Sequence, residues 1–207
     1  SSRHAKTQGS AMGALTGKVA VVIGGHSGFG EAIVQRFHRE GAQIAIAARR
    51  IDVVNAAASA VGGKGYQCDI TNNDEVAALI QNVEKDFGRI DIAVNCAGYE
   101  QSTPIAELTP EKLVAMQAVQ FTGAIYCMQH FGNSMAASGG GSFLSISSQT
   151  AHSPAIGLAA YGSSKAGVEY ATKIAAVEYG PKGVRFNCVA AGLIETPMTA
   201  RVFKVDY

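Results

Sequence analysis

The stretch Val19-Ala-Val-Val-Ile-Gly-Gly-His-Ser-Gly-Phe-Gly30 decides the fold of this chain. Its first five residues are all apolar, which is typical of a strand that is buried on both faces. The glycine-rich turn that follows leads directly into a segment with the apolar periodicity of a helix. A glycine loop that joins a buried strand to a helix is the usual phosphate-binding element of dinucleotide-binding domains. The stretch therefore predicts an α/β domain with a nucleotide site at its first strand–helix junction.

The loop offers what a pyrophosphate needs. Its glycines allow a tight turn, a close approach of the backbone to the anion, and close packing of the helix on the strand. The N-terminus of the helix adds unpaired N–H groups and the positive end of its dipole. The alternative is an ordinary glycine-rich turn that binds no ligand. The cofactor-binding residues predicted in this loop are Gly24, His26, Ser27, Gly28, Phe29 and Gly30.

Apolar runs alternate with helix-period segments along the rest of the chain. Because these runs are continuously apolar, they favour parallel strands covered by helices on both faces. We predict one doubly wound parallel sheet of the Rossmann type, in three layers, formed by residues 16–207 after a disordered tail over residues 1–15. The predicted strands are 19–23, 44–48, 65–69, 90–95, 141–147 and 184–190, and the predicted helices are 29–40, 74–87, 109–135 and 158–179.

The composition argues against several classes of protein. The 207 residues are 47% hydrophobic and 16% charged, which indicates a compact globular chain rather than a disordered one. The net charge of +1, without any run of like charges, argues against nucleic acid as a partner. No apolar stretch approaches the roughly 20 residues of a membrane span. The N-terminal residues also lack the apolar core of a signal peptide.

The cysteines and histidines give no sign of a disulfide framework or a metal site. The four cysteines, at positions 68, 96, 127 and 188, show no CxxC spacing. We interpret them as reduced residues in or beside the core of a cytoplasmic protein. The five histidines are isolated from one another along the chain.

The end of the second predicted strand bears on the choice of dinucleotide. Ala48-Arg49-Arg50 stands where an acid would suit the free 2′-hydroxyl of NAD(H), whereas an arginine suits the 2′-phosphate of NADP(H). Because Arg49 can form paired hydrogen bonds to a phosphate, we expect NADP(H) to be preferred, with NAD(H) as the alternative. In the other interpretation both arginines belong to a solvated strand end.

Two further strand ends carry candidate cofactor residues. Asp69 and Ile70 close the third predicted strand, where the aspartate could accept a hydrogen bond from the adenine amino group or cap the following turn. Asn95-Cys96-Ala97-Gly98 ends the fourth strand. Its small residues let the chain pass close to a ribose, and its asparagine could bridge neighbouring strands.

Tyr161-Gly-Ser-Ser-Lys165 is the candidate for proton transfer. At positions i and i+4 of a helix, a phenol and an ammonium share one face. A nearby cation lowers the pKa of a phenol, and bringing that pKa from about 10 to near neutrality takes about 4 kcal/mol. A buried ammonium and a cationic cofactor ring together could supply this, so that Tyr161 exchanges a proton with an alcohol or a carbonyl. On its own, the pattern also fits a pair on a helix surface.

In their order and spacing, these motifs resemble the short-chain dehydrogenase/reductase family from about Thr16 to Met198. The shared features are the Gly-x-x-x-Gly-x-Gly loop, the Asn-x-Ala-Gly turn, a serine before the tyrosine, and Tyr-x-x-x-Lys. Two later stretches also match the family, Val184-Arg-Phe-Asn-Cys-Val and Gly192-Leu-Ile-Glu-Thr196. Each motif is modest alone, and their order makes the resemblance specific.

The resemblance implies a role for each matching residue. Tyr161 would be the general acid/base, and Lys165 would lower its pKa and hold the nicotinamide ribose. Ser148, thirteen residues before Tyr161, would hydrogen-bond the substrate oxygen. The serine and tyrosine hydroxyls would then stabilise the oxyanion that develops during hydride transfer. The positions that match the family's nicotinamide loop are Gly192, Ile194 and Thr196.

The chain departs from the family pattern in four places. Ile23 and Ala191 replace a threonine and a proline beside the two cofactor loops, and both changes look tolerable. Gln120 replaces the asparagine of the family's proton relay, and we expect its extra methylene to displace the relay water or shift the helix. We keep Gln120 in the catalytic set with the serine, tyrosine and lysine. Only eleven residues follow Thr196, so we expect the sheet to lack the usual C-terminal strand and the chain to lack the substrate lid.

Together the residues and the resemblance predict an NADP(H)-dependent oxidoreductase that interconverts a secondary alcohol and a ketone. Its small-molecule substrate could be a 3-oxoacyl thioester, a steroid, a polyol or a small ketone, in a pocket lined by Tyr99, residues 149–155 and Leu193. The alternative is a nucleotide-binding sensor or scaffold with little catalysis. The resemblance also implies a homodimer or homotetramer built on the helices 109–135 and 158–179, with the dimer as the safer expectation.

Overall fold

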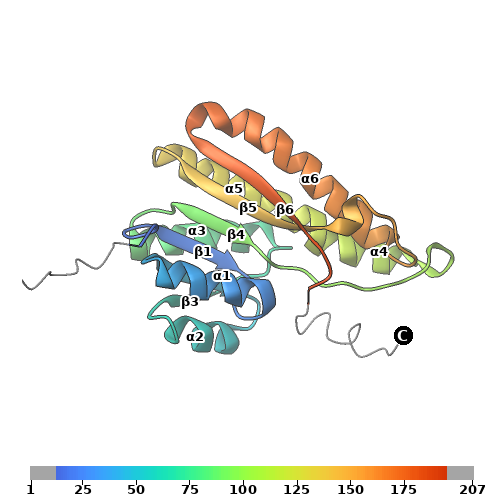
Figure 1. Ribbon diagram of the computed structural model, residues 1–207, viewed down its shortest axis with the longest axis horizontal. Coiled ribbons are helices and arrows are strands. Elements are labelled where there is room, and N and C mark those ends of the chain that lie inside the picture. The colour runs from blue at the N-terminus through green and yellow to red at the C-terminus, as the bar shows by residue number, and fades with distance from the viewer. Residues whose placement is uncertain (1–12, 195–207) are drawn as a thin grey trace, which may run out of the picture.

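The computed structural model describes residues 13–194 and shows one parallel sheet between two layers of helices (Figure 1). The sheet has six strands in the order β3-β2-β1-β4-β5-β6, and every neighbouring pair is parallel, which confirms the predicted doubly wound α/β fold. The strands are β1 Val19–Ile23, β2 Gln43–Ala48, β3 Lys64–Gln67, β4 Ile92–Asn95, β5 Gly141–Ser148 and β6 Val184–Ala191. The α-helices are α1 Gly28–Arg39, α2 Ile51–Ser59, α3 Asn73–Phe87, α4 Pro110–Gln117, α5 Gly123–Ala137 and α6 Ala159–Tyr179. Short 3-10 turns lie at Ile105–Glu107, Gln149–Ala151 and Gly180–Lys182, and a π-helical turn lies at Ala118–Thr122.

The strand β1 lies inside the sheet because it has no polar side chain to expose. All five of its residues are buried, and it pairs with β2 on one side and β4 on the other. The chain first adds β2 and β3 on one side of β1, and then crosses to add β4, β5 and β6 on the other. In such sheets a crevice opens at the carboxyl ends of the strands where the strand order reverses, here between β1 and β4. The glycine loop after β1 lies at this crevice.

Each face of the sheet has its own hydrophobic core. The helices α3, α5 and α6 cover one face, where the rings of Phe131, Phe143 and Phe186 follow one another with centroids 5.9 and 5.3 Å apart. The helices α1 and α2 pack on the other face against β1, β2 and β3, around Val22 and Ile46. Figure 1 shows α6 running along β6 and β5, on the side of the molecule away from α2. The two packed faces fix the strand ends that carry the candidate site.

Two local features differ from the sequence expectation. No helix is predicted between residues 48 and 65, yet the structure has α2, a nine-residue helix that buries Val54 and Ala58. Its run of small residues is too short to give a clear apolar period. The predicted helix 109–135 is divided, because the π-helical turn Ala118–Thr122 separates α4 from α5. Such turns are frequent at functional sites, and this one contains Gln120.

The folded region begins earlier than predicted. The backbone N–H groups of Ala14 and Leu15 donate to the carboxylate and the carbonyl of Glu40, at 3.0 and 2.9 Å. These residues belong to the domain, which corrects its predicted start at residue 16. The earlier part of the expected tail, Thr196 and the expectation of a missing C-terminal strand lie outside the described residues. Between residues 13 and 194, no helix is both long and apolar enough to cross a membrane.

Candidate active site

A single cavity of about 910 Å³ lies at the carboxyl ends of the strands and gathers most of the predicted site residues. Its volume is near the top of the range that is usual for small-molecule and cofactor sites. The cavity extends from the glycine loop after β1, past the ends of β2 and β3, to the end of β5 and the first turns of α6. The predicted residues in its wall are Gly24, His26, Ser27, Gly28, Phe29, Gly30, Arg49, Asp69, Ile70, Ala97, Gly98, Gln120, Ser148, Tyr161, Lys165, Gly192 and Ile194.

The glycine loop forms a cradle that side chains would fill. Gly24 and Gly28 adopt positive φ angles of 76° and 54°, which glycine adopts readily. A Cβ on Gly30 would lie 2.1 Å from the carbonyl oxygen of Gly24, so the helix can approach the loop only because this side chain is absent. Ser27 occupies the N-cap of α1 without capping it through its side chain. The first turn of α1 therefore faces the cavity with N–H groups suited to an anion.

His26 adds an unsatisfied nitrogen to this loop. Within residues 13–194, its Nδ1 is buried and has no hydrogen-bond partner. Burial lowers the pKa of His26, the charge of Arg50 lowers it further, and Glu31 acts in the opposite direction. A buried nitrogen without a partner is costly unless a ligand or water satisfies it. The geometry of the glycines and the unsatisfied nitrogen of His26 both make the loop suitable for the phosphates of a dinucleotide.

The end of β2 brings two exposed arginines to the same cavity. Arg49 directly follows the strand, and its carbonyl accepts a hydrogen bond from Gln67 Nε2 at 3.1 Å. Arg50 is the N-cap residue of α2. Asp69, the acid predicted at the next strand end, accepts from Thr71 N and Thr71 Oγ1 at 2.9 and 2.8 Å through its Oδ1. The turn-capping role of Asp69 is therefore present, and both exposed arginines line this part of the cavity.

Asn95 lies behind the cavity wall rather than in it. Its Oδ1 accepts a hydrogen bond from Ala97 N at 3.1 Å, so its side chain shapes the turn that follows β4. We predicted that Asn95 could bridge neighbouring strands, but its Oδ1 contacts this turn instead. Gly98 leaves no room for a side chain, because a Cβ there would lie 2.8 Å from the amide of Gln120.

The candidate proton-transfer residues converge from β5 and α6. Ser148 ends β5, and its Oγ accepts hydrogen bonds from Thr150 N and Thr150 Oγ1 at 3.2 and 3.0 Å. Tyr161 and Lys165 lie one turn apart in the first half of α6, with the Lys165 Nζ 5.6 Å from the Tyr161 ring centroid. The helix can approach this segment closely because Gly162 lacks a side chain, and a Cβ there would lie 2.9 Å from the Thr150 carbonyl.

Burial dominates the electrostatics of this pair. Burial raises the pKa of the Tyr161 phenol, the hydrogen bond with Ser148 lowers it, and the nearby Glu100 raises it. Burial also lowers the pKa of Lys165 to about 8, and its Nζ donates to the Ile146 carbonyl at 2.9 Å. Burial is the largest effect on the phenol, so in the protein alone the pKa of Tyr161 is raised, and the lowering expected from Lys165 and a cationic cofactor ring together stays a prediction.

Gln120 is buried in the cavity wall and contacts the loop after β4. Its Nε2 donates to the carbonyl of Tyr99, and its Oε1 has no hydrogen-bond partner in the part of the chain that is described. The side chain is 2% exposed. The Nζ of Lys165 donates to the Ile146 carbonyl rather than to Gln120. The π-helical turn thus places Gln120 in the cavity wall as a support for the Tyr99 loop.

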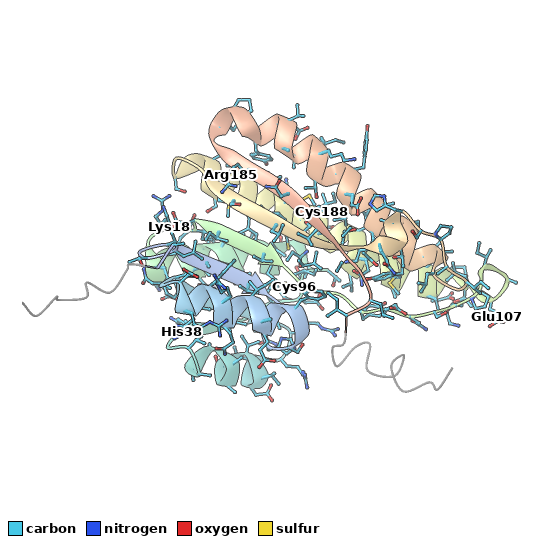
Figure 2. All side chains as sticks on the ribbon, viewed as in Figure 1. Lys18, His38, Cys96, Glu107, Arg185 and Cys188 are labelled. Carbon is cyan, nitrogen blue, oxygen red and sulfur yellow. The ribbon has the colours of Figure 1, made fainter. Side chains whose placement is uncertain are left out.

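Sequence reasoning did not single out several residues of the site. Glu100 lies in the cavity wall beside Tyr161, although no motif contains it. Cys96, just after β4, and Cys188, on β6, lie near the charge of Lys165. Figure 2 labels the two cysteines on the ribbon. Burial raises the pKa of Cys96 to about 12 and also raises that of Cys188, so both thiols are neutral.

Glu169, one turn beyond Lys165 on α6, accepts a hydrogen bond from Ser147 at the end of β5. Its spacing of four residues from the lysine was the one signal that the sequence offered.

Comparisons with known proteins agree with this geometry. The family model described as short chain dehydrogenase matches residues 18–206. A D-threitol dehydrogenase of Mycolicibacterium smegmatis is 34% identical over 89% of this chain and 73% of its own length. Carbonyl reductase family member 4 of Xenopus laevis is 29% identical over 88% of this chain and 78% of its own length. The solved structure of a short-chain type dehydrogenase/reductase from Mycobacterium ulcerans has a TM-score of 0.89 and 30% identity, over 93% of this chain and 73% of that one.

The resemblance noted in the sequence is thus confirmed by matches along nearly the whole domain. The glycine cradle and the Ser148, Tyr161 and Lys165 wall lie in one cavity, as the motifs predict. The chain therefore belongs to the short-chain dehydrogenase family, an NAD(P)-binding family of oxidoreductases that act on alcohols and carbonyl compounds.

Proposed function

We propose that this oxidoreductase is NADP(H)-dependent and interconverts a secondary alcohol and a ketone, with Tyr161 as the general acid/base. The observation that carries the proposal is one continuous cavity, which joins the glycine cradle and Arg49 at one end to Ser148, Tyr161 and Lys165 at the other. A dinucleotide held along this cavity would place its reactive end beside the phenol.

The residues present divide between holding the cofactor and handling the proton. A bound nicotinamide dinucleotide would supply or accept the hydride. Gly24, Gly28 and the first turn of α1 would hold its phosphates, and Lys165 would hold the ribose next to the nicotinamide. Ser148 and Tyr161 would donate hydrogen bonds to the substrate oxygen and stabilise the negative charge that develops there.

The pKa of Tyr161 favours the reductive direction near neutral pH. Because burial raises this pKa above its ordinary value of 10, the phenol is protonated and ready to donate to a forming alkoxide. Oxidation of an alcohol needs the phenolate instead. We therefore propose that ketone reduction is maintained across neutral pH, while alcohol oxidation increases as the pH rises toward the pKa of the phenol.

The preference for NADP(H) rests on charge at the end of β2. Arg49 and Arg50 line the cavity there, and the nearest acid at a strand end, Asp69, uses its Oδ1 in the Thr71 turn. A guanidinium can pair with a 2′-phosphate through two hydrogen bonds. The arrangement suits a phosphorylated ribose better than a free hydroxyl.

The cavity wall supports a neutral substrate. Tyr99, Gln149, Thr150, Ala155 and Leu193 lie in it, whereas residues 151–154 of the predicted stretch 149–155 lie outside it. Glu100 is close enough to raise the pKa of Tyr161, so an anionic group at the same place would be repelled. A small neutral ketone or polyol fits this charge, in keeping with the alcohol and carbonyl substrates in the names of the two relatives.

A panel assay tests the proposed function. NADPH oxidation is followed with small ketones, keto-polyols, 3-oxoacyl thioesters and steroids, in parallel with NADPH binding by fluorescence. We expect binding and turnover with a neutral ketone. Binding without turnover of any compound would instead support the sensor or scaffold, and an absence of binding to both NADPH and NADH would contradict the cofactor assignment.

We also propose that the chain forms a homodimer through α4, α5 and α6. Val114, Tyr170 and Val177 on these helices are 64%, 68% and 77% exposed, which is unusual for large apolar side chains. Val177→Glu should shift the sedimentation coefficient from dimer to monomer, because it would bury a charge in the interface. Exposed Ile51 lies on α2, which packs on the opposite face of the sheet, so Ile51→Glu is the control and should remain dimeric. A monomeric wild type would contradict this proposal.

A further inference from the structure

A carboxylate on α6 ties the end of β5 and the following loop to the helix that carries Tyr161 and Lys165. Glu169 Oε1 accepts a hydrogen bond from Ser147 Oγ at 2.7 Å. Glu169 Oε2 lies 2.8 Å from His152 Nε2. The Glu169 side chain is only 14% exposed, and each of its oxygens has one of these partners.

The two partners bracket Ser148 in the sequence. Ser147 is its neighbour on β5, and His152 follows the 3-10 turn Gln149–Ala151. Glu169 thus holds both ends of the segment 147–152 against α6. Tyr161 and Lys165 lie two turns and one turn before it on the same face of the helix.

A role in packing alone does not explain a carboxylate at this place. Burying a charge costs free energy that charge-assisted hydrogen bonds recover only with good geometry, and an apolar residue of similar size would pack as well. Lys165 makes a parallel contact to the same strand end, because its Nζ donates to the Ile146 carbonyl at 2.9 Å. Two successive turns of α6 therefore bond to two successive residues of β5.

We propose that Glu169 is a positioning residue, and that the Ser147–Glu169–His152 contact, here called the Glu169 clamp, holds the hydroxyl of Ser148 in register with that of Tyr161. Ser148 is set by the backbone between residues 147 and 152, and Thr150 in the same segment donates to its Oγ. Releasing the segment would move Ser148 while leaving Tyr161 on its helix. The consequence for catalysis rests on the proposed function, whereas the clamp itself does not.

Hydrogen–deuterium exchange tests the clamp without any turnover. In Glu169→Gln and in His152→Ala, backbone amides of residues 147–155 should exchange about tenfold faster than in the wild type, because a charge-assisted bond is lost. The His152 side chain is 63% exposed, so its truncation leaves the core intact. Glu178→Gln is the matched control, since Glu178 is an exposed glutamate on the same helix, and its exchange should not change.

Steady-state kinetics test the positioning role. We expect Glu169→Gln and His152→Ala to lower kcat about 10- to 100-fold while the Kd for NADPH stays unchanged, because a small displacement of a reacting group is costly. His152→Gln, which keeps an N–H donor, should recover part of the loss. The double variant should lose no more than the worse single one, because both act through one contact.

The two readouts separate the ways in which the inference can fail. Unchanged exchange in both single variants overturns the clamp. Faster exchange with an unchanged kcat overturns its role in positioning. If the wild type turns over no substrate, the proposed function fails, and the exchange data still decide whether the clamp exists.

Discussion

The two halves of the sheet build the site in different ways. Around β1, β2 and α1, recognition depends on the backbone and on exposed groups, namely the glycine cradle, a helix N-terminus and the arginines after β2. Around β4, β5 and α6, it depends on buried side chains, with Lys165 7% and Gln120 2% exposed. The first half is suited to hold a charged cofactor, and the second is suited to tune the ionisation of a few groups. Substitutions in the two halves should therefore have different effects on cofactor binding, ionisation and turnover.

The largest effect is expected in the second half, at Tyr161. Tyr161→Phe removes the hydroxyl that exchanges the proton and keeps the ring, so kcat for ketone reduction should fall about 10³-fold. The Kd for NADPH, measured by fluorescence, should stay within about twofold, since the cradle is untouched. A variant that keeps half of its kcat would show that Tyr161 is not the acid/base.

The next effect is expected in the first half, at Gly30. A Cβ on this residue would overlap the carbonyl of Gly24, so Gly30→Ala should lower the free energy of unfolding by roughly 2–4 kcal/mol and weaken NADPH binding. Urea denaturation measures the stability. Gly180→Ala is the matched control, because a Cβ there meets nothing within 4 Å, and it should be neutral or slightly stabilising. Equal behaviour of the two variants would contradict the cradle geometry.

A third effect separates stability from function at Lys165. Burial lowers its pKa from 10.5 to about 8, so between these values the unfolded chain binds a proton that the folded protein does not. The free energy of unfolding should therefore rise by about 3 kcal/mol as the pH increases through this window. Lys165→Met should lack this rise, and at pH 7 it should be at least as stable as the wild type but inactive. Urea curves at several pH values measure this, and parallel stability profiles of the two proteins would contradict it.

The smallest effect concerns the choice of cofactor. Arg49→Ala should weaken NADPH binding roughly 10- to 30-fold and change NADH binding little, because only NADPH carries the 2′-phosphate. Fluorescence titrations with both cofactors measure the difference, with Arg39→Ala on the far end of α1 as the control. If Arg49→Ala weakens both cofactors equally, Arg49 is a surface residue and the NADP(H) preference is wrong.

The same contrast explains what the sequence could predict. The cradle, the buried strands and the Tyr161–Lys165 pair depend on local patterns, namely glycine spacing, continuous apolar runs and an i, i+4 spacing. They could be assigned before the structure. The helix α2 could not, because its small residues leave no clear period.

The features that escaped prediction depend on tertiary contacts. The Glu169 clamp joins residues 147, 152 and 169, which come together only when α6 packs on β5. The contact of Gln120 with Tyr99 depends on a π-helical turn that no motif announces. The raised pKa of Tyr161 in the protein alone comes mainly from burial, which the spacing of Tyr161 and Lys165 does not reveal.

Isotope transfer tests the central claim most directly. Wild-type protein is incubated with NADPH that carries deuterium at the transferable position of the nicotinamide, together with a neutral ketone that it turns over, and the alcohol product is examined by mass spectrometry. We expect one deuterium on the carbinol carbon of the product that the wild type forms, and we expect Tyr161→Phe to form no such product. Bound NADPH that gives no deuterated alcohol from any ketone would contradict the central claim.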